Sequence, residues 1–171
     1  MRTSHVVIFA IAALALHAGA QTLVTESALS TDAALEVARG ALAFCRKEGQ
    51  KVSVTVVDHA GRAKVALRDD GAGPYTAEHS FRKAYTALSY KTTSAEVGKR
   101  AAEAKGAAIG PQLLPNMTTS AGGVPIKMGN AIVGAVGVSG TPGSAGGGEH
   151  DAKCAEAGVE RIARELAAGA K

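Results

Sequence analysis

The segment Val52–Asp58 constrains the fold most, because apolar valines recur there at every second position. A period of two is typical of a strand that buries one face and turns the other away from the core. Ala60-Gly61 then turns the chain into a second strand, Ala63–Arg68. The sequence therefore predicts a β-hairpin whose valine face packs against other elements.

A second hairpin is predicted in the C-terminal half of the chain. Gly129-Asn130 suits the positive φ angles of a tight turn, and it separates the strands Val124–Lys127 and Ala131–Ser139. A further strand is predicted over Met117–Ser120. We therefore expect a sheet of four or five strands.

Helical spacing of apolar residues indicates the remaining elements. The first helix is capped by Ser30 or Thr31 and ends at Gly49, and the next two are predicted over Thr76–Tyr90 and Ser94–Ala107. The last follows the glycine-rich segment Gly140–Gly148, with a stripe of Ala152, Ala155, Val159, Ile162 and Leu166. This order of elements predicts an α/β (α+β) domain, an antiparallel sheet with helices packed on it.

The N-terminus has the pattern of a secretory signal peptide. Basic Arg2 precedes the apolar run Val6–Leu16 and the small residues of His17–Ala20. That run is shorter than the roughly 20 residues of a membrane-spanning helix. We therefore expect cleavage after Ala20, a periplasmic or secreted protein, and no membrane span in the mature chain. The predicted organisation is a signal peptide (1–20), a linker (21–29) and one domain (30–171).

Charge and composition argue against nucleic acid as a partner. Removal of the signal peptide takes away Arg2 and no acidic residue, so the formal net charge falls from +4 to +3. The basic residues form no run, and the chain has no Trp, three Tyr and three Phe. A nucleic-acid site needs a clustered basic face, and single strands also need stacking aromatics.

Two cysteines, Cys45 and Cys154, lie on different predicted helices. Thiols tend to pair in an oxidising compartment, provided that their Cα atoms lie within about 7 Å. The alternative is a pair of buried, unpaired cysteines, and the sequence leaves both open. Neither a zinc-ligand spacing nor a Cys-x-x-Cys motif is present.

Histidines are the candidate metal ligands. The mature chain contains His59, His79 and His150, and a neutral imidazole can bind a metal ion or haem iron. His79 lies in the first turn of the central helix, near Tyr75 and one turn before Lys83. Because an irregular segment follows that helix pair, we expect His79 beside a pocket.

The candidate catalytic motifs in the sequence are incomplete. Ser139 lacks the full Gly-x-Ser-x-Gly pattern of a nucleophile elbow. The glycine-rich segment before the last helix has neither a Walker lysine nor a dinucleotide fingerprint, and Glu149 and Asp151 already occupy the positive end of that helix. The sequence therefore does not predict an autonomous hydrolase.

Five short segments follow one another in a recognisable order: Asp69–Pro74, Arg82–Ala87, Gly122–Pro125, Gly134–Val138 and Asp151–Gly158. From about Leu29 to Leu166, the chain resembles the GlcG/HbpS family of haem-binding proteins. The resemblance implies a profilin-like fold with a five-stranded antiparallel sheet, homo-oligomers, and haem or a related tetrapyrrole bound near the central helix.

The resemblance also implies candidate ligand-binding residues on that helix, namely Glu78, Lys83 and Thr86. Lys83 and Thr86 are three residues apart, so both are expected to face one ligand. Thr86 is the implied oxygen ligand of the iron, and Lys83 is the implied partner of a propionate. We add His79 as a second candidate iron ligand, with Tyr75 nearby, because imidazole is the usual proximal ligand of haem.

Three functional hypotheses follow. The first is an exported haem-binding protein for haem or redox sensing or handling. The second is an enzyme or accessory protein that acts on a small organic acid or in haem breakdown. The third is an oligomeric structural subunit without a ligand. No unmistakable axial ligand separates them in the sequence.

Overall fold

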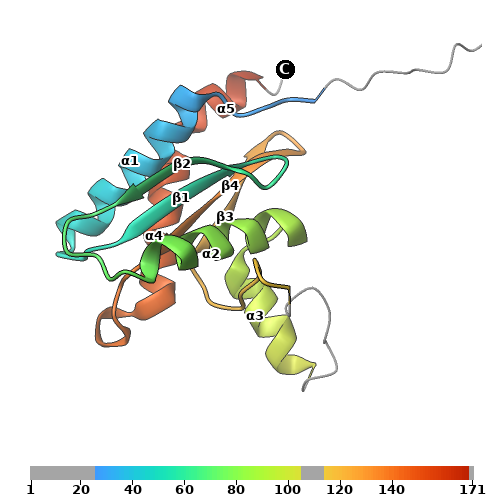
Figure 1. Cartoon of the computed structure of the whole chain (residues 1–171). Helices are drawn as coiled ribbons and strands as arrows, with labels where there is room; N and C mark the ends of the chain where they lie inside the picture. The colour runs from blue at the N-terminus through green and yellow to red at the C-terminus, as the bar shows by residue number, and fades with distance from the viewer. Residues whose placement is uncertain (1–25, 105–113, 170–171) are drawn as a thin grey trace, which may run out of the picture.

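A computed structural model describes residues 26–104 and 114–169 of the chain. It is an antiparallel sheet with helices on both faces (Figure 1). The signal peptide predicted over residues 1–20 lies outside the described residues, as do residues 21–25 of the predicted linker. Among the described residues, no helix has both the length and the apolar character needed to span a membrane.

The helices and strands follow the predicted order. They are α1 (Thr31–Lys47), β1 (Ser53–Asp58), β2 (Ala63–Arg68), α2 (Thr76–Tyr90), α3 (Ser94–Glu103), β3 (Gly123–Met128), β4 (Ala131–Ser139), a 3₁₀ turn (Gly143–Ala145), α4 (Gly147–Glu160) and α5 (Ala163–Gly169). Both hairpins and the antiparallel sheet flanked by helices are confirmed. The last predicted helix is divided into α4 and α5.

The expectation of five strands is wrong, because the described sheet has four, in the order β2-β1-β4-β3. Met117–Ser120, predicted as a strand, is a loop. Two of its backbone N–H groups donate to side chains: that of Thr118 to Thr86 Oγ1 (3.0 Å), and that of Ser120 to Thr118 Oγ1 (3.2 Å). In a strand, these backbone N–H groups would instead donate to carbonyl groups of the neighbouring strand. The profilin-like assignment stays a prediction.

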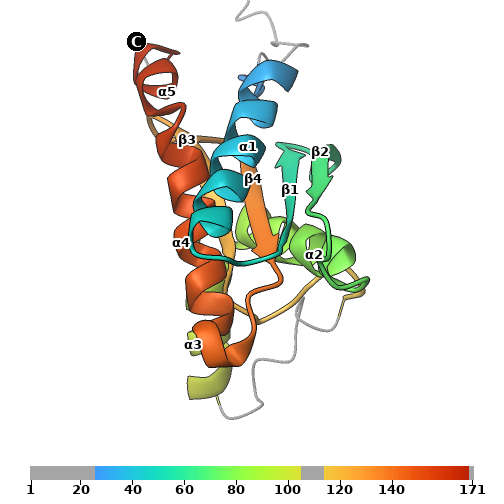
Figure 2. The ribbon, with the colours of Figure 1, turned by 90° about the vertical axis from the view of Figure 1, so that its left-hand side faces the viewer.

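The main hydrophobic core lies on the face of the sheet that carries α1 and α4. Val54 and Val56 of β1 pack there with Val136 and Val138 of β4, as the alternation of β1 predicts. Figure 2 shows α1 and α4 side by side on this face. A disulfide between Cys45 and Cys154 joins the two helices, with their Cα atoms 5.6 Å apart.

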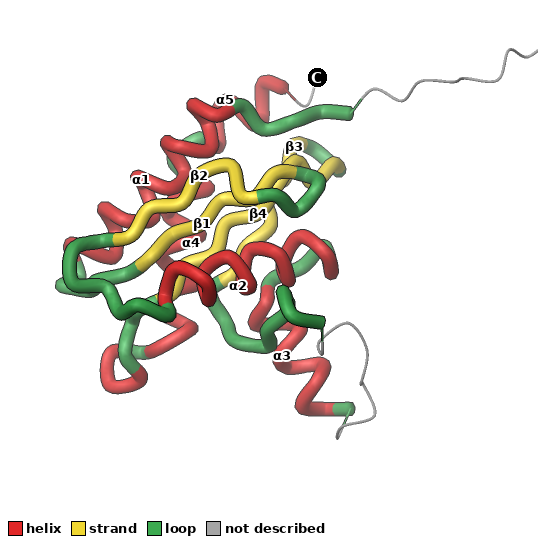
Figure 3. The backbone as a smooth tube through the Cα atoms, in the orientation of Figure 1, coloured by secondary structure: helices red, strands yellow, loops and turns green. Residues whose placement is uncertain are grey.

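On the opposite face, α2 packs across the strands of the sheet (Figure 3). Gly123 and Gly137 are paired across β3 and β4, and a Cβ atom on either would overlap a carbonyl oxygen of α2. The hydroxyl of Thr55 also bonds that of Ser80 at 2.7 Å. Small side chains therefore set the height of α2 above the strands and fix the position of its polar residues.

We expect Gly137→Ala to destabilise the protein, because the added methyl group would push against the carbonyl oxygen of Ser80 and lift α2. Overpacking of this kind costs about 1–3 kcal/mol. Gly143→Ala is the matched control, since its Cβ would meet no atom within 4 Å. Thermal unfolding of both variants checks the close approach, and equal melting temperatures would contradict it.

Candidate functional site

A buried ion pair stands at the centre of the candidate site. Lys83 Nζ of α2 lies 2.7 Å from Asp151 Oδ2 of α4, and the two side chains are only 2% and 3% exposed. The second carboxylate oxygen of Asp151 accepts the N–H of Thr141 at 3.1 Å. Burial lowers the pKa of Lys83, and the neighbouring Asp151 carboxylate opposes this shift. The pair thus neutralises an ammonium that would be costly to bury alone.

A cleft of about 160 Å³ adjoins this ion pair. It lies where α2, the end of β4, the first turn of α4 and the loop before β3 meet. Its polar lining comprises the ion pair, an imidazole and several hydroxyl groups, from Lys83, Asp151, His79, Ser120, Ser139 and Thr141.

His79 lies at the mouth of the cleft, with both ring nitrogens close to hydroxyl groups. Nδ1 is 3.1 Å from Ser139 Oγ, and Nε2 is 3.4 Å from Thr118 Oγ1. Partial burial lowers the pKa of His79, and the nearby Lys83 ammonium lowers it further. The folded protein therefore favours the neutral imidazole, which is the form that binds metal ions.

An outer hollow of about 390 Å³ opens on the exposed side of α2. It is lined by Tyr75, Glu78, His79 and Arg82, so it shares Tyr75 and His79 with the inner cleft. Tyr75 is 64% exposed, and its ring centroid lies 6.3 Å from that of His79. Glu78 and Arg82 form an ion pair along the helix. This arrangement gives His79 an aromatic neighbour and a charged rim.

The structure brings three of the predicted ligand-binding residues together and leaves two apart from them. Tyr75, His79 and Lys83 all line the inner cleft. Tyr75 and His79 also line the outer hollow, whereas Glu78 lines the outer hollow alone. Thr86 is fully buried and lines neither.

Thr86 Oγ1 accepts the N–H of Thr118 and contacts Met117 Sδ at 3.6 Å. Lys83 and Thr86 therefore do not face one ligand in this arrangement. A bond from Thr86 to iron stays a prediction.

Sequence reasoning missed Asp151 and Ser139 as parts of the site. The sequence indicates Asp151 as an acidic residue at a helix start and as part of a family segment, but in the structure its carboxylate balances Lys83. A signal was present, because Lys83 lies on the apolar side of the predicted central helix, next to Ala84 and one turn before Ala87. A lysine in such a position needs a buried acid. Nothing in the sequence indicates which acid it is.

The other candidate histidines lie elsewhere. His59 follows β1, is 3.0 Å from Glu26, and lines separate surface hollows of about 290 and 410 Å³. His150 lies in the first turn of α4, beside the disulfide. The structure therefore does not bring the three histidines together.

Comparison with known proteins identifies related sequences and structures. Residues 29–160 match the family described as haem-degrading protein, HbpS-like. The crystal structure of HbpS is 37% identical, with a TM-score of 0.74, and the alignment covers 83% of this chain and 96% of HbpS. A double mutant of Streptomyces reticuli HbpS is 36% identical, with a TM-score of 0.74, over 87% of this chain and 97% of the mutant.

A crystal structure of a PduOC–haem complex is 25% identical, with a TM-score of 0.71. That alignment covers 80% of this chain and 96% of PduOC. The comparison with curated proteins gives no match.

We expect Asp151→Asn to lower the free energy of unfolding by about 3–5 kcal/mol, because it leaves the Lys83 ammonium buried without a counter-ion. The double variant Asp151→Asn/Lys83→Met has no buried charge. Its loss in free energy of unfolding should therefore be clearly smaller than the sum of the losses in Asp151→Asn and in Lys83→Met. Urea unfolding of the four proteins measures this coupling. Strictly additive losses would contradict a direct buried pair.

The lowered pKa of His79 predicts a pH dependence of stability. As the pH falls below the ordinary histidine value of 6.5, the unfolded chain takes up a proton before folded His79 does. The stability that neutral His79 contributes is therefore present above pH 6.5 and is lost as the pH falls through the lowered, folded-state pKa. An NMR titration of the His79 ring measures that pKa, and a midpoint at or above 6.5 would contradict the burial argument.

Proposed function

We propose, from the premise that this chain belongs to the HbpS-like family, that it is an exported haem-binding protein with His79 as the iron ligand. The observation that carries the proposal is the state of His79, which is half-buried at the junction of the cleft and the outer hollow and favours its neutral form. Haem binding in a PduOC relative of the same fold adds support.

The residues around His79 fit the chemistry of haem, provided that the iron replaces the long 3.4 Å contact of His79 Nε2 with the hydroxyl of Thr118. A bound haem supplies an iron whose axial position an imidazole can take, together with an apolar ring and two carboxylates. The inner cleft, at about 160 Å³, is smaller than the roughly 300 Å³ at which pockets for drug-sized ligands begin, whereas the outer hollow, at about 390 Å³, lies in that range. We therefore assign the ring to the outer hollow, where Tyr75 offers an exposed aromatic face.

This assignment changes the roles that the resemblance implies. Lys83 is held by Asp151 and faces the inner cleft, so its ammonium is not free for a propionate. Arg82 lies at the rim of the outer hollow, with its side chain 39% exposed. Arg82 is paired with Glu78, but that pair is exposed, so a propionate can compete for the guanidinium as it cannot for the buried Lys83. We propose Arg82 as the cation for a propionate and Lys83 as a positioning residue, which fixes the end of α2 that carries His79.

The small-acid hypothesis has less support in the same geometry. The cleft beside Lys83 has a suitable size, but Asp151 cancels the positive charge that would attract a carboxylate. The contact between Ser139 and His79 invites comparison with a hydrolase. However, the other ring nitrogen of His79 meets the hydroxyl of Thr118, whereas a triad places a carboxylate there.

Export rests on the signal peptide predicted over residues 1–20. The disulfide between Cys45 and Cys154 supports it, because disulfides persist mainly in oxidising compartments. Homo-oligomers stay a prediction from the family resemblance.

A haemin titration followed by absorbance tests the proposal. We expect the unmodified protein to bind haem saturably, at a simple ratio of haem to subunit. In His79→Ala the Soret band should shift, and the affinity for haem should be at least about tenfold lower, as is common when a metal site is disturbed. His59→Ala is the matched control, since His59 is an exposed histidine that lines neither the inner cleft nor the outer hollow. Loss of binding in His59→Ala with unchanged binding in His79→Ala would contradict the assignment, as would nonsaturating absorbance in the unmodified protein.

A further inference from the structure

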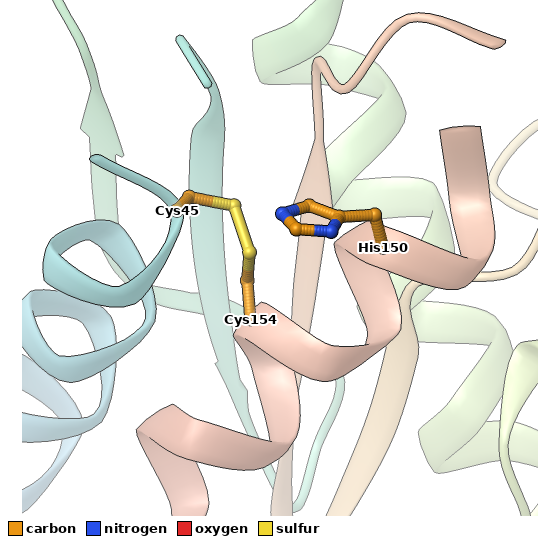
Figure 4. A group of neighbouring side chains, drawn as sticks. All are labelled: Cys45, His150 and Cys154. Atoms are coloured by element: carbon orange, nitrogen blue, oxygen red, sulfur yellow. A yellow bond between two sulfur atoms is a disulfide. The ribbon is translucent and has the colours of Figure 1, made fainter. Parts of the chain in front are cut away.

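The disulfide between Cys45 and Cys154 has a neighbour that the haem proposal does not use. His150 turns its imidazole toward the two sulfurs, as Figure 4 shows. Its Nε2 atom is buried and has no hydrogen-bond partner among the described residues. Buried polar atoms are almost always paired, so an unpaired ring nitrogen calls for an explanation.

The three side chains come from two helices that pack against each other. Cys45 belongs to the last turn of α1, while His150 and Cys154 are four residues apart on α4 and therefore lie on the same side of that helix. The ring of Phe44 lies 6.4 Å from that of His150, and both cysteines are fully buried. The cluster is thus a shielded position between the helices.

The spacing of the cluster suits a metal ion once the sulfurs are no longer bonded to each other. One ligand atom from each residue lies within 4.8 Å of the others. Two thiolates on a tetrahedral Zn²⁺, each bonded at about 2.3 Å, stand roughly 3.8 Å apart. The Cα separation of 5.6 Å between Cys45 and Cys154 is compatible with that distance, so the helices need not part.

We propose that reduction of this disulfide creates a Cys₂His site for a thiophilic divalent ion such as Zn²⁺. A dithiol reductant supplies two electrons and two protons, which gives two protein thiols and the cyclic disulfide of the reductant. Zn²⁺ then displaces the two thiol protons, and Nε2 of His150 supplies the third ligand. Water completes the tetrahedron, as in other zinc sites with three protein ligands.

This site is separate from the proposed haem site. His150 and Asp151 are consecutive, but His150 faces Cys45 of α1, whereas Asp151 faces Lys83 of α2. A disulfide oxidant, which takes two electrons from the two thiolates and is itself reduced to thiols, would release the metal ion and restore the disulfide between α1 and α4. The occupancy of the site would therefore report the thiol redox state of the protein.

The test compares the untagged full chain in its oxidised form and after reduction by a dithiol that is then removed without air. Zn²⁺ is titrated against a chromophoric chelator. We expect one Zn²⁺ per reduced chain and none per oxidised chain. His150→Ala should weaken binding at least about tenfold, whereas His59→Ala, a histidine outside the cluster, should leave it unchanged.

If reduction partly unfolds the protein, circular dichroism measures whether Zn²⁺ restores its helical structure. A reduced chain that has lost helical signal should recover it when Zn²⁺ is added, because metal binding then drives folding. A reduced and folded chain that binds no Zn²⁺ would overturn the proposal. So would a reduced chain that Zn²⁺ fails to refold, or a His150→Ala variant that binds Zn²⁺ as tightly as the unmodified protein.

Discussion

An ammonium and a carboxylate that are both removed from solvent stabilise the fold only when they face each other, and the contact between Lys83 and Asp151 meets this condition. The pair joins α2 to α4, two helices on opposite faces of the sheet, just beyond the end of β4. The backbone of Thr141 is bound to the same carboxylate. Because of this contact, the first turns of α2 and α4 and the end of β4 share one fixed arrangement, in which His79 meets Ser139.

The remaining contacts of α4 explain how one helix can serve two sites. The N-terminal half of α4 presents Asp151 toward α2 and His150 toward α1. On the other side of the sheet, the paired glycines Gly123 and Gly137 let α2 approach closely. The haem proposal depends on the α2 side of this frame, and the metal proposal depends on the α1 side.

Local patterns predicted the elements well, because periodicity and turn residues act over short distances. The strand Ala63–Arg68 and the helix Thr76–Tyr90 have the predicted bounds. The prediction of a strand over Met117–Ser120 is wrong because backbone N–H groups of this segment donate hydrogen bonds to the side chains of Thr86 and Thr118. The partner of Lys83 was equally out of reach, since 68 residues separate it from Asp151 and only the fold brings them together.

A crystal structure of the haem complex, with the iron located by its anomalous scattering, tests the central claim most directly. The account predicts iron at bonding distance from a ring nitrogen of His79, with the porphyrin over the outer hollow near Tyr75 and Arg82. Iron beside His59, or a haem bound away from α2, would contradict it.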